Sequence, residues 1–205
     1  MDDRVRGDVA AGALLARVRR LLANRTPRTV PDGDRRRAAV LLPLYVRDGA
    51  LHVLCTQRTE DLPHHKGQVA FPGGGRDPGD ADLLATALRE AEEEVGIAPR
   101  EVEVLGTLDD EATVASRFIV TPVVGVIPCS YPFRPNPAEI VELLHVPIEP
   151  LLESNGFREE TRERDGTAVR VLFLDHGPHV IWGLTARILK GFIELLRSEP
   201  GRPGG

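Results

Sequence analysis

Cysteine, aromatic residues and long apolar runs are scarce in this chain of 205 residues. Its two cysteines, Cys55 and Cys129, are too few to staple a domain of this size, which favours a reducing compartment. No apolar run approaches the roughly 18 to 20 residues that a membrane span needs. The N-terminal segment MDDRVRGD is charged and has no apolar signal core. We therefore expect a cytoplasmic protein without a membrane partner.

Charge is distributed unevenly along the chain. Residues 1–37 hold ten arginines against five acidic residues, a local charge of +5, whereas the remainder carries −10. A basic arm can meet nucleotide phosphates or the acidic body of the protein, but we expect most of these arginines to be solvated. Because the body is acidic and aromatic residues make up only 4% of the chain, we expect no nucleic-acid partner.

The chain has the length of one ordinary domain with a short appendage. Apolar residues at helical spacing predict a helix over residues 9–23, and prolines with a glycine predict a linker over residues 26–34. We expect an N-terminal helix and linker over residues 1–34, one folded domain over residues 35–198, and a disordered tail over residues 199–205.

Strand-like segments on both sides of a central helix favour a mixed sheet sandwiched between helices, an α/β fold. The dipeptide Asp48-Gly49 predicts a hairpin between its two flanking strands. Strands are expected over residues 38–46, 51–57, 102–108, 118–127, 140–146 and 169–174, and helices over residues 81–95 and 181–197. Trp182 and Phe192 stand at helical spacing in the last helix, and we expect both in the core.

The predicted helix over residues 81–95 has an apolar stripe and an acidic face. At about 100° per residue, four apolar side chains fall in one narrow sector: Leu84, Leu88, Ala91 and Val95. Glu90, Glu93 and Glu94 are expected on the opposite side, where three carboxylates repel each other unless a cation neutralises them. Oxygen ligands of this kind suit Mg²⁺ or Mn²⁺. Glycines 73–75, just before the helix, let the backbone approach a metal or a phosphate closely.

The segment from Gly73 to Ile97 resembles the signature of the Nudix hydrolase family. That signature is Gly, five residues, Glu, seven residues, and then Arg-Glu-apolar-x-Glu-Glu-x-Gly-apolar. Here it runs from Gly75 to Arg89-Glu90-Ala91-Glu92-Glu93-Glu94-Val95-Gly96-Ile97. One position departs, because Ala81 replaces the isolated glutamate, which in the family helps to position the arginine. Either Asp80 or Asp82 can take over that contact.

The residues before this motif resemble the coenzyme A pyrophosphatase subgroup of the family. The matching residues are Leu54-Cys55-Thr56-Gln57-Arg58-Thr59, Gly67 and Phe71-Pro72-Gly73-Gly74. Pro63 stands where the subgroup pattern has an arginine, and His64, His65 and Lys66 follow it. The resemblance covers roughly residues 38 to 190, and it implies that Arg58 faces the active-site cleft.

The resemblance implies an α/β/α sandwich and a pyrophosphatase that acts on a small nucleotide substrate. Coenzyme A or a derivative is the implied substrate, with 3′,5′-ADP and 4′-phosphopantetheine, or its acyl form, as products. Glu90, Glu93 and Glu94 would hold Mg²⁺ or Mn²⁺ together with the Gly73 backbone. The implied substrate-binding residues are Arg58, Lys66, Gly73 and Gly74.

Several alternatives stay open at this stage. Arg89 is expected to orient the site, and Glu90, Glu93 and Glu139 are all candidates for the catalytic base. Glu111 is a rival to Glu139 as an acid from outside the motif. The same motif could cleave ADP-ribose or another nucleoside diphosphate derivative, or belong to a nucleotide-sensing module without turnover, although its intact acids argue against the latter. A homodimer also stays open.

Overall fold

The computed structural model of the chain describes residues 3–60, 67–113, 117–154, 156–164 and 166–198. The elements in chain order are α1 (Asp3–Ala23), β1 (Arg36–Arg47), β2 (Ala50–Arg58), β3 (Val69–Ala70), β4 (Gly73–Gly75), α2 (Leu83–Val95), a 3₁₀ turn (Pro99–Glu101), β5 (Glu103–Thr107), β6 (Glu111–Ala112), β7 (Phe118–Val126), β8 (Ile140–Pro147), α3 (Glu149–Glu153), β9 (Phe157–Arg164), β10 (Thr167–His176), β11 (His179–Trp182) and α4 (Gly183–Arg197). None of the described helices is long and apolar enough to cross a membrane.

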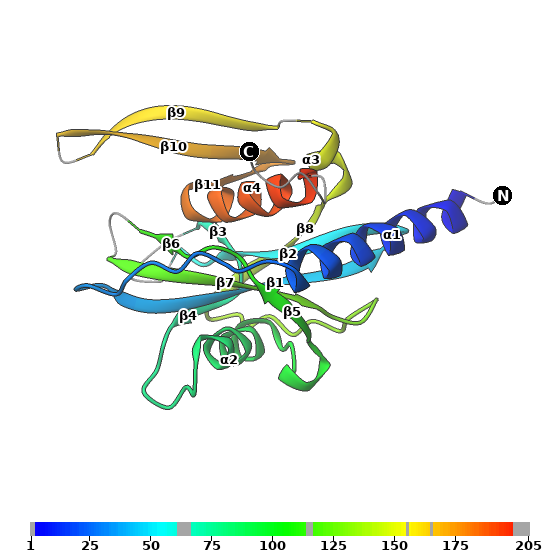
Figure 1. Ribbon diagram of the computed structural model, residues 1–205, viewed down its shortest axis with the longest axis horizontal. Helices are drawn as coiled ribbons and strands as arrows, with labels where there is room; N and C mark the ends of the chain where they lie inside the picture. Colours follow the sequence, from blue (N-terminus) through cyan, green and yellow to red (C-terminus); the bar gives the residue numbers. More distant parts are fainter. Residues whose placement is uncertain (1–2, 61–66, 114–116, 155, 165, 199–205) are drawn as a thin grey trace.

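A mixed sheet forms the middle layer of the molecule. Its strand order is β3-β2-β1-β7-β5, with β4 beside β1, β6 beside β7 and β8 beside β2. The strands β1 and β7 run parallel, whereas β1–β2 and β5–β7 are antiparallel. The helix α2 covers one face of this sheet, and α1 and α4 cover the other (Figure 1). The predicted α/β/α sandwich is confirmed.

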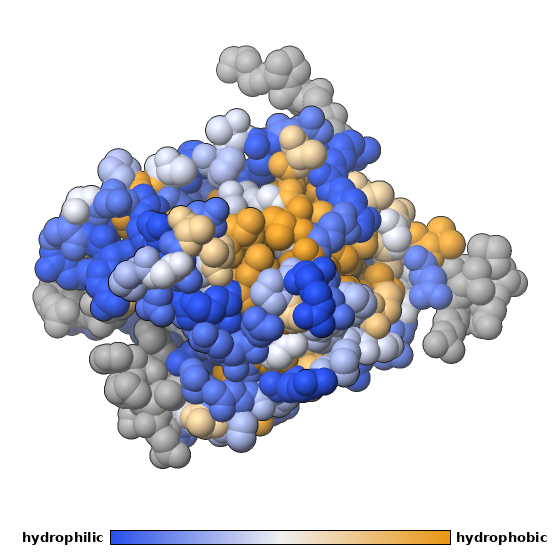
Figure 2. Space-filling model, turned by 90° about the horizontal axis from the view of Figure 1, so that it is seen from below, coloured by the Kyte–Doolittle hydropathy of each residue, from blue (hydrophilic) through white to orange (hydrophobic). Residues whose placement is uncertain are grey.

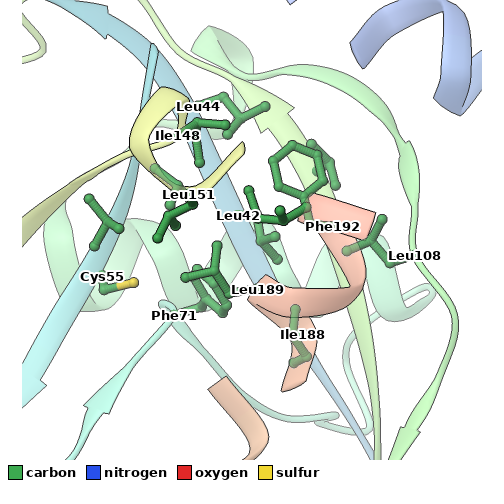
Figure 3. Close-up of a cluster of buried hydrophobic side chains, with 14 of the residues drawn as sticks. Leu42, Leu44, Cys55, Phe71, Leu108, Ile148, Leu151, Ile188, Leu189 and Phe192 are labelled. Carbon is green, nitrogen blue, oxygen red and sulfur yellow. The ribbon is translucent and has the colours of Figure 1, made fainter. Parts of the chain in front are cut away.

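Both faces of the central strand β1 are buried, because helices cover both faces of the sheet. Leu41 and Tyr45 point to the cluster under α2, whereas Leu42 and Leu44 point to the cluster under α1 and α4. Figure 3 shows this second cluster, in which Leu42 and Phe192 lie among the buried side chains. The core therefore fixes β1 and α2 against each other, and these two elements frame the site described below.

A second, three-stranded sheet was not expected. The strands β9, β10 and β11 form an antiparallel sheet that lies over α4 (Figure 1). Only residues 169–174 of it were predicted, because β9 reads FREETRER and has almost no apolar residues to signal a strand. Trp182 ends β11, is 40% exposed and stacks on Phe173, so its predicted place in the core is wrong. Phe192 is fully buried, as predicted.

The N-terminal arm lies against the acidic body. Arg25 and Arg28 both contact Asp109, at 2.5 and 2.8 Å, and Arg37 contacts the buried Asp110 at 2.8 Å. The expectation of solvated arginines is therefore wrong for Arg25 and Arg37, whose side chains are only 20% and 21% exposed, whereas Arg28 in the linker remains 89% exposed. The predicted domain limits stay a prediction, and the predicted tail over residues 199–205 lies outside the described residues.

The two cysteines are not linked. Cys55 is buried in the core and Cys129 is exposed, and both are free. This agrees with the expectation that no disulfide staples the domain.

Candidate active site

The acidic helix α2 begins and ends at residues suited to those positions. The Asp82 carboxylate caps its first turn by accepting a hydrogen bond from the Ala85 amide, at 2.8 Å. Gly96 ends it in the left-handed region, at φ 73°, which favours glycine. Ala87, Ala91 and Val95 pack against the sheet. The helix starts at Leu83, two residues later than predicted.

The three glutamates do not share one solvent-facing side, which corrects the sequence prediction. Glu94 is 2% exposed and Glu90 is half-buried, whereas the side chain of Glu93 is 57% exposed. The helix packs against β1 and also against β4, so its buried arc is wider than one apolar stripe. Seen from the side on which α2 lies, the surface is mostly hydrophilic around a central group of hydrophobic residues (Figure 2).

Arg89 is anchored by Asp80, which settles the choice that the sequence left between Asp80 and Asp82. Its Nε lies 3.0 Å from Asp80 Oδ1 and its second terminal nitrogen 3.1 Å from Oδ2. Its remaining terminal nitrogen contacts Glu90 at 2.9 Å and Glu93 at 3.1 Å. Hydrogen bonds from Arg89 hold the pKa of Asp80 well below its usual range. Asp80 thus makes the contact that Ala81 cannot make.

Asp80 is itself held by two further groups. Its carboxylate accepts hydrogen bonds from the Asp77 amide at 2.9 Å and from the buried Thr86 hydroxyl at 2.8 Å. Sequence reasoning missed Thr86 and Asp77. The signal for Thr86 is a polar residue on the buried side of the helix, where a hydroxyl needs a partner.

Arg58 holds the buried end of the same group of carboxylates. It ends β2, where the pairing with β8 shifts between Gln57 and Arg58, and such an irregularity can redirect a side chain. Its two terminal nitrogens lie 2.8 Å from Glu94 Oε1 and 3.6 Å from Glu139 Oε2. The structure therefore brings Arg58, Glu94 and Glu139 together.

Burial is the largest influence on the pKa values of Glu90 and Glu94. It raises the pKa of Glu94 to about 7, although Arg58 and the Gly73 amide, 3.2 Å from Glu94 Oε2, act in the opposite direction. Burial also raises the pKa of Glu90, and the charges of Glu93 and Glu139 add to this effect. Carboxylates that raise each other's pKa attract a cation.

Two glycines bring the backbone of β4 against these carboxylates. Gly73 has φ 157°, and a Cβ there would lie 2.4 Å from the Ala39 carbonyl oxygen. A Cβ on Gly74 would lie 2.5 Å from the carboxyl carbon of Glu90. No other residue fits at either position without movement of its neighbours, so Gly73 lets β4 approach β1 closely and Gly74 leaves the room that Glu90 occupies.

One further predicted residue lies apart from this group. Glu111 accepts a hydrogen bond from Arg187 at 3.1 Å, so this rival of Glu139 is engaged by α4. Lys66, together with Pro63, His64 and His65, lies outside the described residues.

The carboxylate oxygens of this site suit a hard divalent cation, although the carboxylates do not form a metal-binding cluster in this structure. Among the described residues, no three His, Cys, Asp or Glu side chains come together as a metal site. Arg58 and Arg89 are instead paired with Glu94 and Glu90. Glu90, Glu93 and Glu94 offer oxygen donors only, which suits Mg²⁺ or Mn²⁺ rather than zinc.

The comparison with known families agrees with this geometry. The model of the NUDIX domain family matches residues 34–165, and the chain belongs to this family. Curated relatives include the uncharacterized Nudix hydrolase NudL of Photorhabdus laumondii, 42% identical over 80% of this chain and 86% of the relative. NudL of Yersinia pestis is 43% identical over 76% of this chain and 77% of the relative. The chain is thus a Nudix hydrolase, a class that uses divalent metal ions and acts on small nucleotide substrates.

Solved structures resemble the chain more distantly. A Caenorhabditis elegans Ap4A hydrolase complex has a TM-score of 0.47 and 20% identity, over 58% of this chain and 84% of that one. The NUDIX domain of Shewanella oneidensis NrtR, crystallised with ADP ribose, has a TM-score of 0.43 and 24% identity, over 65% of this chain and 85% of that one.

Proposed function

We propose that the chain hydrolyses the pyrophosphate bond of coenzyme A or a derivative, with Mg²⁺ or Mn²⁺, to 3′,5′-ADP and 4′-phosphopantetheine or its acyl form. The observation that supports this most directly is the place of Arg58. It belongs to the motif that resembles the coenzyme A subgroup, and it lies 2.8 Å from Glu94 of the Nudix motif. The two motifs therefore meet in one site, as a shared substrate would require.

Glu90, Glu93 and Glu94 are the residues that would hold the metal, with the Gly73 backbone beside them. A divalent ion, when bound, neutralises the charge of the pyrophosphate and acidifies water. Arg89 keeps Glu90 and Glu93 in place, because Asp80 fixes the far side of its guanidinium. Gly74 leaves the space in which the Glu90 carboxylate sits.

Glu139 is the residue that we propose as the base, which accepts a proton from the attacking water. Among the three candidates, Glu90 and Glu93 are both paired with Arg89, whereas Glu139 contacts Arg58 only at 3.6 Å and Asn136 at 3.3 Å. Its side chain is 35% exposed, so solvent and substrate can reach it. A base must lie within hydrogen-bond reach of the proton that it takes.

A turnover screen of the purified protein with Mg²⁺ and with Mn²⁺ tests this proposal. The substrates are coenzyme A, dephospho-coenzyme A, ADP-ribose and a dinucleotide, with the products resolved by mass. We expect coenzyme A to give 3′,5′-ADP and phosphopantetheine without inorganic phosphate. In ¹⁸O-water the label should enter a phosphate of one product, because the attack is at phosphorus. Tenfold faster turnover of ADP-ribose would exclude the coenzyme A assignment and leave only the family chemistry.

A charge-assisted contact to the 3′-phosphate is worth about 1.5 to 3 kcal/mol, roughly ten- to a hundredfold in an equilibrium constant. A true coenzyme A enzyme should therefore favour coenzyme A over dephospho-coenzyme A by a factor of that order in kcat/KM. Equal kcat/KM values would show that the site does not bind the 3′-phosphate.

We also propose a cytoplasmic location, which the two free thiols support.

A further inference from the structure

The side chain of Arg58 has an unusual set of contacts for a half-buried arginine. Its side chain is 21% exposed, and its two ion-pair partners are Glu94 and Glu139. Its Nε is buried and has no hydrogen-bond partner in the described part of the chain. A guanidinium has five N–H donors, so a buried one without a partner marks an arrangement that is not fully satisfied.

The two partners of Arg58 are residues that the proposed chemistry needs for other purposes. Glu94 is a proposed metal ligand and is 2% exposed, and Glu139 is the proposed base. A divalent ion held by Glu94 Oε1 would compete with the guanidinium for that oxygen and would repel its positive charge. Arg58 and the metal therefore cannot both keep their best position at Glu94.

Arg89 provides the contrast within the same site. It contacts Glu90 and Glu93, but two of its nitrogens are bound to Asp80, which is not a proposed metal ligand. A metal at Glu90 and Glu93 thus leaves Arg89 anchored. Among the described residues, the only other ion-pair partner of Arg58 is Glu139, at 3.6 Å, which is a looser contact than that of Arg89 with Asp80.

We propose that Arg58 is an exchangeable counter-ion of the metal site: it neutralises Glu94 before the metal binds, and the metal displaces it toward the phosphates of the substrate. This inference rests on the proposed metal-dependent function. It makes Arg58 a positioning residue for Glu94 in the metal-free protein. The displaced guanidinium then becomes available for the substrate, and the anion that it meets is a pyrophosphate.

Metal binding without substrate tests this exchange. Mg²⁺ affinity is measured by calorimetry at pH 8.5 for the wild-type chain and for each variant. Arg58→Gln removes the competing charge, so we expect Mg²⁺ to bind at least threefold more tightly. Arg187→Gln is the matched control, because it removes the same charge from a half-exposed arginine paired with Glu111, and it should leave the affinity within twofold. Unchanged or weaker binding in a folded Arg58→Gln variant overturns the inference.

A second measurement on the wild-type chain covers the case in which Arg58→Gln does not fold. The ¹⁵N-labelled Nε–H signal of Arg58, assigned with Arg58→Lys, is followed during a Mg²⁺ titration. We expect this signal to move as Glu94 is released, and to move more than that of Arg89. An Arg58 signal that stays in place at saturating Mg²⁺ overturns the inference alone, whereas a wild-type chain that binds no Mg²⁺ would overturn the proposed function as well.

Discussion

Arg58 and Arg89 face the same group of carboxylates from two sides, and their surroundings differ. Arg89 is bound to Asp80, which the Asp77 amide and the Thr86 hydroxyl hold in turn. Arg58 is bound to Glu94 and Glu139 alone among the ion pairs of the described residues. One arginine is therefore part of the scaffold, and the other depends on the groups that carry the chemistry. Pairing with a carboxylate does not by itself tell which role an arginine has.

The largest effect is expected from the carboxylates that contact the two arginines and that we propose as metal ligands. Glu93→Gln or Glu94→Gln keeps the shape of the side chain but removes a charged ligand, so turnover should fall by about two orders of magnitude or more. Steady-state kinetics with Mg²⁺ and a circular dichroism spectrum measure activity and fold together. Glu111→Gln, whose partner is Arg187, should keep near-normal activity. Near-normal turnover in either motif variant would remove that residue from the metal site.

A smaller loss is expected when the anchor of Arg89 is removed. Asp80→Asn takes away the charge that fixes the guanidinium, so we expect kcat to fall by roughly ten- to a hundredfold, because the positions of Glu90 and Glu93 loosen.

Asp82→Ala is the control for this variant. Asp82 caps the same helix without touching Arg89, so its loss should lower the free energy of unfolding by about 1 kcal/mol and leave kcat within twofold. An Asp82 variant that loses as much activity as the Asp80 variant would show that helix stability, and not the anchoring of Arg89, limits the rate.

The smallest effect concerns pH and the carboxyl group beside Arg58. The folded-state pKa of Glu94, about 7, lies above its ordinary value of 4.5. Such a group contributes stability below its unfolded pKa and loses that contribution as the pH rises through its folded pKa. In EDTA, the metal-free protein should thus lose stability through Glu94 between about pH 4.5 and pH 7.

Thermal melting of the wild-type chain and of Glu94→Gln in EDTA measures this loss. The Tm of the variant minus the Tm of the wild type should rise by about 3 °C or more between pH 5 and pH 8. Saturating Mg²⁺ at pH 8 should raise the Tm of the wild type and have less effect on the variant. A Tm difference that does not depend on pH would show that Arg58 and the Gly73 amide fully offset the burial of Glu94.

The sequence predicted the sandwich and the acidic helix, because these depend on local patterns of apolar residues and charges. It did not predict that Gly73–Gly75 forms the strand β4 beside β1. It could not predict that Glu94 is buried, since a helical wheel assumes one buried stripe, whereas α2 packs against both β1 and β4. It missed β9, whose charged residues form an edge strand without apolar alternation. It placed Trp182 in a helix, but the residue belongs to the preceding strand.

The choice between Asp80 and Asp82 as the partner of Arg89 could not be made from the sequence either. Both are acids near the start of α2, and the sequence left both as partners for Arg89. The structure uses the side chain of Asp82 for the Ala85 amide, so it is already committed to the cap. Asp80 lies in the turn before the helix, where its position depends on the conformation of residues 77–80.

The contacts of Arg25, Arg28 and Arg37 with Asp109 and Asp110, here called the clasp, have a consequence for proteolysis. By composition the arm is rich in trypsin sites, yet the side chains of Arg25, Arg28 and Arg37 are each bonded to one of these two acids. A protease must take the arginine into its own pocket with the backbone extended, so cleavage after these residues requires the clasp to open first. Where reclosing is faster than cleavage, the cutting rate reports how often the arm opens in the native protein.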